Sequence, residues 1–162
     1  MLFRSMASPE ALLHGDLHTG SIMVTESQTR VIDPEFAFYG PMGFDVGAVL
    51  ANLLMAYFAS SGHERAPGER REFEGWVLET VDQVWNEFAR KFLDLWRSDA
   101  GGDAYPVSLF AGEKGAARLE LERQAYMQRL FTDTVGFAAA KTIRRIFGLA
   151  HNIDFELIED PR

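Results

Sequence analysis

The sequence predicts an α+β fold that is mostly helical and has one short β-hairpin near its beginning. Two β-prone runs lie on either side of a polar segment, and from Phe44 onward apolar residues recur at spacings of three and four. The chain has 162 residues, of which 47% are hydrophobic, and this suits one compact unit with its own core. We therefore expect a single domain over residues 1–162.

The predicted hairpin pairs residues 21–24 with residues 30–32. Both runs are rich in isoleucine and valine, and the polar residues 25–29 between them predict a loop longer than a tight turn. An antiparallel pair returns the chain to its starting edge. The residues just before the first strand and just after the second should therefore lie at the same end of the hairpin.

Three helices are predicted over residues 44–59, 69–98 and 116–149, because each range has apolar residues at helical spacing. Gly136 is a candidate break in the third helix. Residues 99–115 contain four glycines and one proline, so we expect a long loop there. Its middle, which is rich in apolar and aromatic residues, should pack against the body.

The composition narrows the classes of partner. The formal charge of -8 argues against a general affinity for nucleic acid or for an anionic membrane, and favours small ligands or a metal cation. The most apolar stretch, residues 46–59, is about 14 residues long, shorter than the roughly 20 needed to cross a bilayer. With no cysteine and no export signal in the first ten residues, a cytoplasmic location is expected.

Two acidic motifs stand at the ends of the predicted hairpin. Asp16 lies in the segment 14–21, and Asp33 and Glu35 follow the second strand directly. An aspartate beside glycine or proline is, taken singly, more often a turn residue. Carboxylates at both ends of one hairpin, however, should converge, and phosphoryl transfer needs one carboxylate to accept a proton and others to bind Mg²⁺.

The order His14-Gly15-Asp16 resembles the catalytic motif of small-molecule kinases of the aminoglycoside phosphotransferase type, in the protein-kinase-like superfamily. Residues 14–21 and 33–45 together are similar to the methylthioribose kinase family nearly residue for residue. The resemblance implies the carboxyl-terminal lobe of a protein-kinase-like fold, with the hairpin bearing the catalytic and metal motifs. It also implies ATP and Mg²⁺ as cofactors.

The resemblance also assigns residue roles. It implies Asp16 as the catalytic base and Asp33 and Glu35 as magnesium ligands. Ser21 stands where the wider superfamily has asparagine, so it either touches the metal or caps the strand. Asp45 should begin a helix and accept hydrogen bonds from the catalytic loop.

The remaining predicted site residues lie beside the catalytic aspartate or near the end of the chain. His14 and His18 should orient the loop rather than transfer protons. Residues 141–151 also resemble the family, and Arg144 and Arg145 are expected on the substrate side. Without the resemblance, adjacent arginines are more often a solvated residue and a salt-bridge partner.

The predicted reaction is ATP-dependent phosphorylation of 5-methylthioribose at its 1-hydroxyl, in methionine salvage, with a homodimer as the expected assembly. Another small hydroxylated substrate stays open. No segment resembles the amino-terminal, nucleotide-binding lobe, so we expect a fragment of a full kinase. Two alternatives are a non-catalytic binding or dimerisation module, and a zinc hydrolase using His14, Asp16 and His18.

Overall fold

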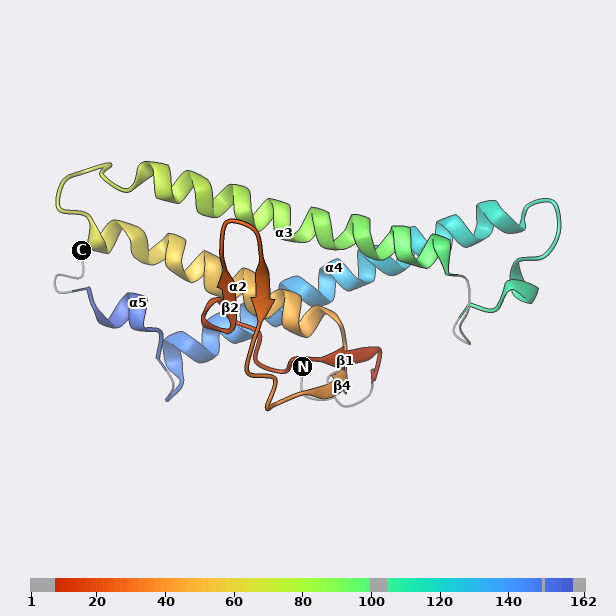
Figure 1. The fold of residues 1–162 in the computed structure, drawn as a ribbon, viewed down its shortest axis with the longest axis horizontal. Coiled ribbons are helices and arrows are strands. Elements are labelled where there is room, and N and C mark those ends of the chain that lie inside the picture. Colours follow the sequence, from red (N-terminus) through yellow and green to blue (C-terminus); the bar gives the residue numbers. More distant parts are fainter. Residues whose placement is uncertain (1–7, 100–104, 150, 159–162) are drawn as a thin grey trace.

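The computed structural model describes residues 8–99, 105–149 and 151–158. Three long helices run side by side, and the strands lie across their middle on one side (Figure 1). The helices are α2 (Gly43–Ser60), α3 (Arg71–Ser98) and α4 (Gly115–Phe147), followed by the short α5 (Ile153–Glu156). The predicted fold class, α+β and mostly helical, is confirmed.

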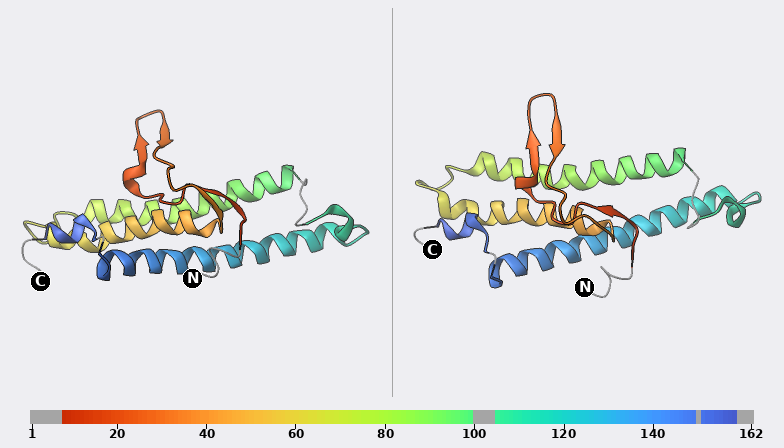
Figure 2. Two further views of the ribbon diagram at one scale, coloured as in Figure 1. Left: turned by 90° about the horizontal axis from the view of Figure 1, so that it is seen from below. Right: turned by 60° about the horizontal axis from the view of Figure 1, so that its bottom comes forward.

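The predicted hairpin is present. Strand β2 (Ile22–Val24) pairs antiparallel with β3 (Thr29–Val31), so that Ile22 lies opposite Val31. The hairpin stands away from the helices (Figure 2), and Val24 is 70% exposed. Its strands therefore contribute little to the core, and the role of the hairpin is to set the positions of the loops at its open end.

A second pair of strands is not predicted from the sequence. Strand β1 (Ala11–Leu13) pairs antiparallel with β4 (Phe38–Gly40), with Leu13 opposite Phe38. The hairpin and both acidic motifs lie between these two strands in the chain. Residues 14–18 follow β1 directly, and residues 33–37 lead directly into β4. The two segments therefore meet the small sheet at the same end, where they lie beside each other.

Helix α2 is the central element of the core. It packs against both α3 and α4, and Val49 and Leu53 of α2 form a buried cluster with Val77 of α3. A Cβ atom placed on Gly47 would lie 2.6 Å from the carbonyl oxygen of Thr134 in α4. Glycine at position 47 therefore allows the backbones of α2 and α4 to approach closely.

The apolar stretch around α2 is longer than expected from the sequence. Within the described residues, one segment, Gly43–His63, has 21 residues and is long and apolar enough to cross a membrane by length and composition. Its most apolar window is 56% buried inside the structure. This burial against α3 and α4 is what a core helix shows.

Two further expectations are tested by α4 and the loop before it. Tyr105 in that loop packs against Trp96 of α3 and Tyr126 of α4, at ring-centroid distances of 5.0 and 6.5 Å, so the predicted packing of the loop is confirmed. The predicted break at Gly136 is wrong, because α4 continues through it to Phe147. A helical glycine costs only about 1 kcal/mol, and the next residue, Phe137, is buried.

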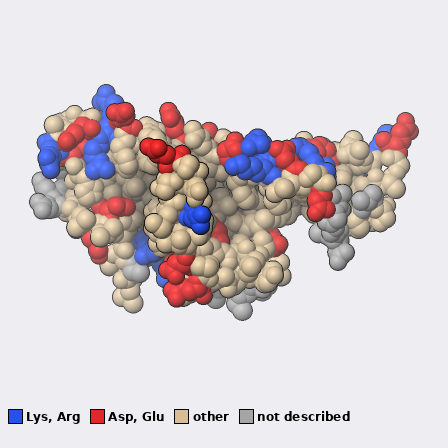
Figure 3. Space-filling model, in the orientation of Figure 1, with Lys and Arg blue, Asp and Glu red and all other residues tan. Residues whose placement is uncertain are grey.

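The outer face of α3 is highly charged. Figure 3 shows basic and acidic side chains interspersed along this helix. Arg90 contacts Glu87 and Asp94 one turn away, and Arg97 joins α3 to α4 through Glu120, with nitrogen and oxygen 2.6 Å apart. Such exposed pairs contribute roughly 0–1 kcal/mol each. They therefore favour solubility more than stability.

Candidate active site

The two loops that bear the acidic motifs touch through their backbones at Gly15. This glycine has a φ of 87°, and a Cβ atom at its position would lie 2.1 Å from the carbonyl oxygen of Phe36. Only glycine fits, both because of the left-handed backbone and because of the close approach. The loop that presents Asp16 therefore lies directly against the loop that contains Asp33 and Glu35.

Asp45 binds the backbone of the loop that leads to Asp16. It lies in the first turn of α2 and is 8% exposed. Its carboxylate accepts hydrogen bonds from the backbone N–H of His14 at 2.6 Å and from that of Gly15 at 3.1 Å. These hydrogen bonds are the ones expected for Asp45, and they fix the two residues that precede Asp16. The expectation that Asp45 begins the helix is wrong, because α2 begins at Gly43 with Met42 as its N-cap.

His14 joins the two motif loops. Its Nε2 lies 2.8 Å from the carbonyl oxygen of Ile32, the residue before Asp33. Its Nδ1 lies 3.4 Å from the backbone nitrogen of Asp16, which donates to it. The tautomer protonated on Nε2 satisfies both contacts, so both ring nitrogens are engaged by backbone groups.

Ser21 and His18 make local contacts within the same loop. Ser21 is 4% exposed, and its hydroxyl donates to the carbonyl oxygen of Asp16 at 3.2 Å. His18 accepts at Nδ1 from the N–H of Gly20 at 3.0 Å. Together with His14 and Asp45, these side chains bind the backbone on both sides of Asp16.

The carboxylate of Asp16 lies at a cavity of about 310 Å³. Its Oδ1 is 3.3 Å from Nζ of Lys141, and its Oδ2 is 3.9 Å from Nε2 of His18. The cavity combines three aromatic walls with one acidic and two basic side chains and a glycine backbone: Phe36, Phe38, Phe44, Asp16, Lys141, Arg144 and Gly15. The mixture suits a small ligand with both apolar and hydroxyl-bearing parts.

Asp33 and Glu35 lie on one exposed loop, two residues apart. Asp33 has a φ of 65°, a left-handed conformation that is uncommon outside glycine and is often found at functional sites. Magnesium prefers oxygen ligands and is usually bound by one or two carboxylates together with waters and phosphate oxygens. The donor set of this loop therefore fits Mg²⁺ by chemistry.

In the part of the chain that the structure describes, no three His, Asp or Glu side chains form a group that could hold a metal ion. Asp16, Asp33 and Glu35 therefore do not make a three-ligand metal centre by themselves. The same holds for His14, Asp16 and His18. The contacts of the two imidazole rings with backbone groups also count against the zinc hydrolase alternative.

The two predicted arginines line different cavities. Arg144 lines the cavity at Asp16, whereas Arg145 lines a separate one of about 270 Å³ together with residues near α5, including Asn152 and Phe155. Adjacent residues on an α-helix point about 100° apart, so a single site rarely receives both. The structure brings Arg144 to Asp16 and leaves Arg145 on another side of α4.

Lys141 is not predicted as a site residue, although it contacts Asp16. A signal was present in the sequence: Lys141 stands three residues before Arg144 on the same helix, so the two share a face. Pairing that face with Asp16 requires knowledge of how α4 crosses α2. This information is not local to either motif.

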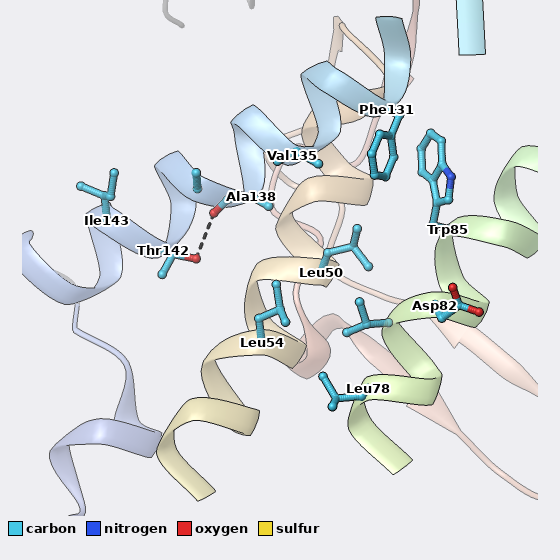
Figure 4. A pocket seen from close by; sticks show the side chains of 12 residues that line it. Leu50, Leu54, Leu78, Asp82, Trp85, Phe131, Val135, Ala138, Thr142 and Ile143 are labelled. Atoms are coloured by element: carbon cyan, nitrogen blue, oxygen red, sulfur yellow. Dashed lines mark hydrogen bonds between the residues drawn. The ribbon is translucent and has the colours of Figure 1, made fainter. Parts of the chain in front are cut away.

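A larger cavity of about 700 Å³ lies between α2, α3 and α4 (Figure 4). Its walls are mainly leucine, valine and aromatic side chains from all three helices, among them Leu50, Leu78, Trp85 and Phe131. None of the predicted site residues lines it. It is an apolar groove, separate from the cavity at Asp16.

The sequence of the chain is similar to those of several known kinases. The chain is 52% identical to Methylthioribose kinase 1 of Oryza sativa subsp. japonica over 153 residues, 93% of this chain and 35% of the relative. It is 39% identical over 158 residues to Methylthioribose kinase of Escherichia coli O45:K1, covering 98% of this chain and 37% of the relative. It is 41% identical over 154 residues to Methylthioribose kinase of Geobacillus kaustophilus, covering 95% and 34%.

The chain thus spans about a third of the length of the curated relatives it matches. That share and the mostly helical architecture agree with the expected carboxyl-terminal lobe of a protein-kinase-like fold. Residues 1–83 match the model of the Phosphotransferase enzyme family, and this range includes both acidic motifs and Asp45. Because the match covers more than half of the 162 residues, the chain belongs to the phosphotransferase enzyme family.

Proposed function

We propose that this chain is the catalytic lobe of a methylthioribose kinase, which transfers the γ-phosphoryl group of ATP to the 1-hydroxyl of 5-methylthioribose. The reaction would serve methionine salvage in the cytoplasm. The observation that carries the proposal is the carboxylate of Asp16, presented at a cavity by a loop whose backbone is bound on both sides. The names of the relatives supply the acceptor.

The proposed unit is one lobe of a larger enzyme. Residues 1–162 would form a single lobe, and a nucleotide-binding lobe would come from the rest of the kinase. The share of the relatives' length that the chain spans supports this division. Full activity, including tight binding of ATP, is therefore proposed for the complete kinase.

In the proposed mechanism, Asp16 accepts the proton of the acceptor hydroxyl. The hydroxyl oxygen forms a bond to the γ-phosphorus. At the same time the bond between the γ-phosphorus and the oxygen that bridges it to the β-phosphorus breaks, and ADP leaves with the electron pair of that bond. Such reactions depend mainly on alignment and on stabilisation of phosphoryl charge. The Oδ2 atom of Asp16, 3.9 Å from His18, is the oxygen proposed to face the acceptor.

Asp33 and Glu35 are the residues proposed to hold magnesium. When bound, the ion would neutralise charge on the phosphate oxygens of ATP. The exposed oxygens of both side chains support this role, as does the contact of their loop with Gly15. The left-handed backbone of Asp33 is a further feature in its favour, since such conformations cluster at functional sites.

We assign the other predicted residues to substrate binding and loop support. Arg144 is placed with the acceptor or the migrating phosphoryl group, because its fork of N–H donors lines the cavity. Arg145 would act from its separate cavity. The hydrogen bonds of the remaining loop residues support a positioning role: His14, His18, Ser21 and Asp45.

The test joins the chain to the nucleotide-binding lobe of a methylthioribose kinase and follows formation of methylthioribose 1-phosphate from ATP, Mg²⁺ and 5-methylthioribose by mass spectrometry. Asp16→Asn keeps the size of the side chain and should lower turnover by about 10²- to 10⁴-fold, with an unchanged circular dichroism spectrum. Glu79→Gln, at an exposed carboxylate on α3, is the matched control and should leave turnover unchanged. Equal turnover by Asp16→Asn and wild type would remove Asp16 from the mechanism.

Two companion assays address the acceptor and the metal. Replacing methylthioribose by ribose or by another small sugar tests the alternative of a different hydroxylated substrate. The double variant Asp33→Asn, Glu35→Gln should raise the Mg²⁺ concentration that gives half-maximal turnover. An unchanged magnesium dependence would contradict the assignment of these two carboxylates.

A second candidate function, a non-catalytic dimerisation module, is favoured by the apolar groove between α2, α3 and α4. Phe131 and Val135 in its wall are 44% and 50% exposed, and a second copy of the chain would cover them. Analytical ultracentrifugation would decide. A dimer that Val135→Glu dissociates, in a chain that transfers no phosphate even when joined to a nucleotide-binding lobe, would favour the module over the kinase.

A further inference from the structure

Lys141 reaches Asp16 from a distant part of the chain. The two residues are 125 positions apart, and Nζ lies 3.3 Å from Oδ1, within hydrogen-bonding distance. The lysine stands on α4, while Asp16 lies in the loop after β1. The contact therefore joins the catalytic loop to the helix that also presents Arg144 to the same cavity.

The surroundings of Lys141 favour a fixed ammonium group. Its side chain is 14% exposed, compared with 37% for Asp16 and 66% for Lys91 on α3. Nζ also lies 4.7 Å from the ring centroid of Phe44, where a cation is attracted by the face of the ring. A nearly buried charge is costly unless it is paired. Asp16 and Phe44 together supply that pairing.

The two carboxylate oxygens of Asp16 have different neighbours. Oδ1 accepts from Lys141, whereas Oδ2 lies 3.9 Å from His18, beyond hydrogen-bonding distance. A carboxylate held through one oxygen cannot rotate freely about its terminal torsion, which is otherwise broad. The other oxygen, Oδ2, is then held in one direction and has no hydrogen-bond partner closer than His18 among the described contacts of Asp16.

We propose that Lys141 is the positioning residue that fixes the Asp16 carboxylate so that Oδ2 faces the acceptor hydroxyl. This inference rests on the proposed kinase function for its catalytic consequence, although the Lys141–Asp16 contact itself does not. It predicts that loss of the ammonium lowers kcat while the acceptor still enters the cavity. It also predicts that a second permanently charged donor, arginine, restores part of the effect.

The test compares Lys141→Met, Lys141→Arg and Lys91→Met with wild type in two measurements. The first is the ¹³C carboxyl resonance of Asp16 in chain labelled with ¹³C-aspartate, assigned as the signal that Asp16→Asn removes. The second is kcat and KM for methylthioribose, measured with the chain joined to a nucleotide-binding lobe. Lys91→Met is the matched control, since it removes an exposed lysine whose ion pair is with Glu87 of the same helix, far from Asp16 in the chain.

The expected result is a shifted or broadened Asp16 resonance in Lys141→Met, with kcat lowered by up to about 100-fold and KM changed little. Lys141→Arg should restore both values in part, and Lys91→Met should match wild type. A purely structural role would instead lower thermal stability without rescue by arginine. Should Lys141→Met not fold, Lys141→Gln, also uncharged, takes its place.

The Lys141 proposal and the kinase proposal fail separately. An unchanged Asp16 resonance in the uncharged variants would overturn the role of Lys141, whatever the activity. If wild type makes no methylthioribose 1-phosphate even when joined to a nucleotide-binding lobe, the proposed function of this chain fails, and the carboxyl resonance alone decides whether Lys141 orients Asp16.

Discussion

Replacement of Asp45 by alanine should destabilise the fold by about 3–4 kcal/mol, because it leaves two backbone donors without an acceptor and removes a charge from the start of α2. His14 N–H at 2.6 Å and Gly15 N–H at 3.1 Å both donate to this carboxylate, which is 8% exposed. A hydrogen bond to a charged group contributes about 1.5–3 kcal/mol, and the lower end applies here because both donors are only partly buried. The loss of a negative charge at the first turn of α2 adds about 0.3–1 kcal/mol.

Urea unfolding followed by far-UV circular dichroism measures this loss. Asp45→Asn keeps one acceptor oxygen, so it should cost about half as much as Asp45→Ala. Glu79→Ala removes an exposed carboxylate from α3 and should change the free energy of unfolding by less than about 0.5 kcal/mol. A cost below about 1 kcal/mol for Asp45→Ala would refute the view that this carboxylate holds the catalytic loop.

Three further predictions concern glycine packing and pH. Gly47→Ala places a Cβ atom 2.6 Å from a backbone oxygen of Thr134, so it should lower the free energy of unfolding by about 1–3 kcal/mol. A cost below about 0.5 kcal/mol would contradict the close helix contact. Gly15→Ala should lower kcat sharply with little loss of helix signal, since it pushes the catalytic loop away from Phe36; unchanged kinetics would contradict this. Burial raises the pKa of Tyr126, so the fold keeps this proton above about pH 10, where the unfolded chain loses it, and stability should fall as pH rises. Urea unfolding at pH 8 and at pH 11 should show a smaller fall for Tyr126→Phe than for wild type, and equal falls would contradict the assignment.

Most of the fold is predictable because its signals are local. The hairpin and the three helices follow from periodicity within each segment, and their observed ends differ from the predicted ones by at most two residues. The pair β1 and β4 is not predictable in this way. Each strand has three residues, too few to show alternation, and the pairing spans the whole motif region.

The candidate site likewise contains residues that the local sequence predicts and one residue, Lys141, that it does not. Asp16, Asp33, Glu35 and Asp45 lie within one short region, and the predicted hairpin together with the family resemblance placed them in one candidate site. Lys141 joins this region only through the crossing of α2 and α4, which no local pattern reveals. Helical geometry does explain why Arg144 lines the cavity of Asp16 while the next arginine does not.

A chimera tests most directly whether this chain is the catalytic lobe of a methylthioribose kinase. This chain would replace the matching 35% of the rice Methylthioribose kinase 1, so that the remaining part of that enzyme is present. The chimera should phosphorylate methylthioribose, and its Asp16→Asn version should not. A folded chimera that is inactive, or one whose activity survives Asp16→Asn, would contradict the assignment of this chain as the catalytic lobe.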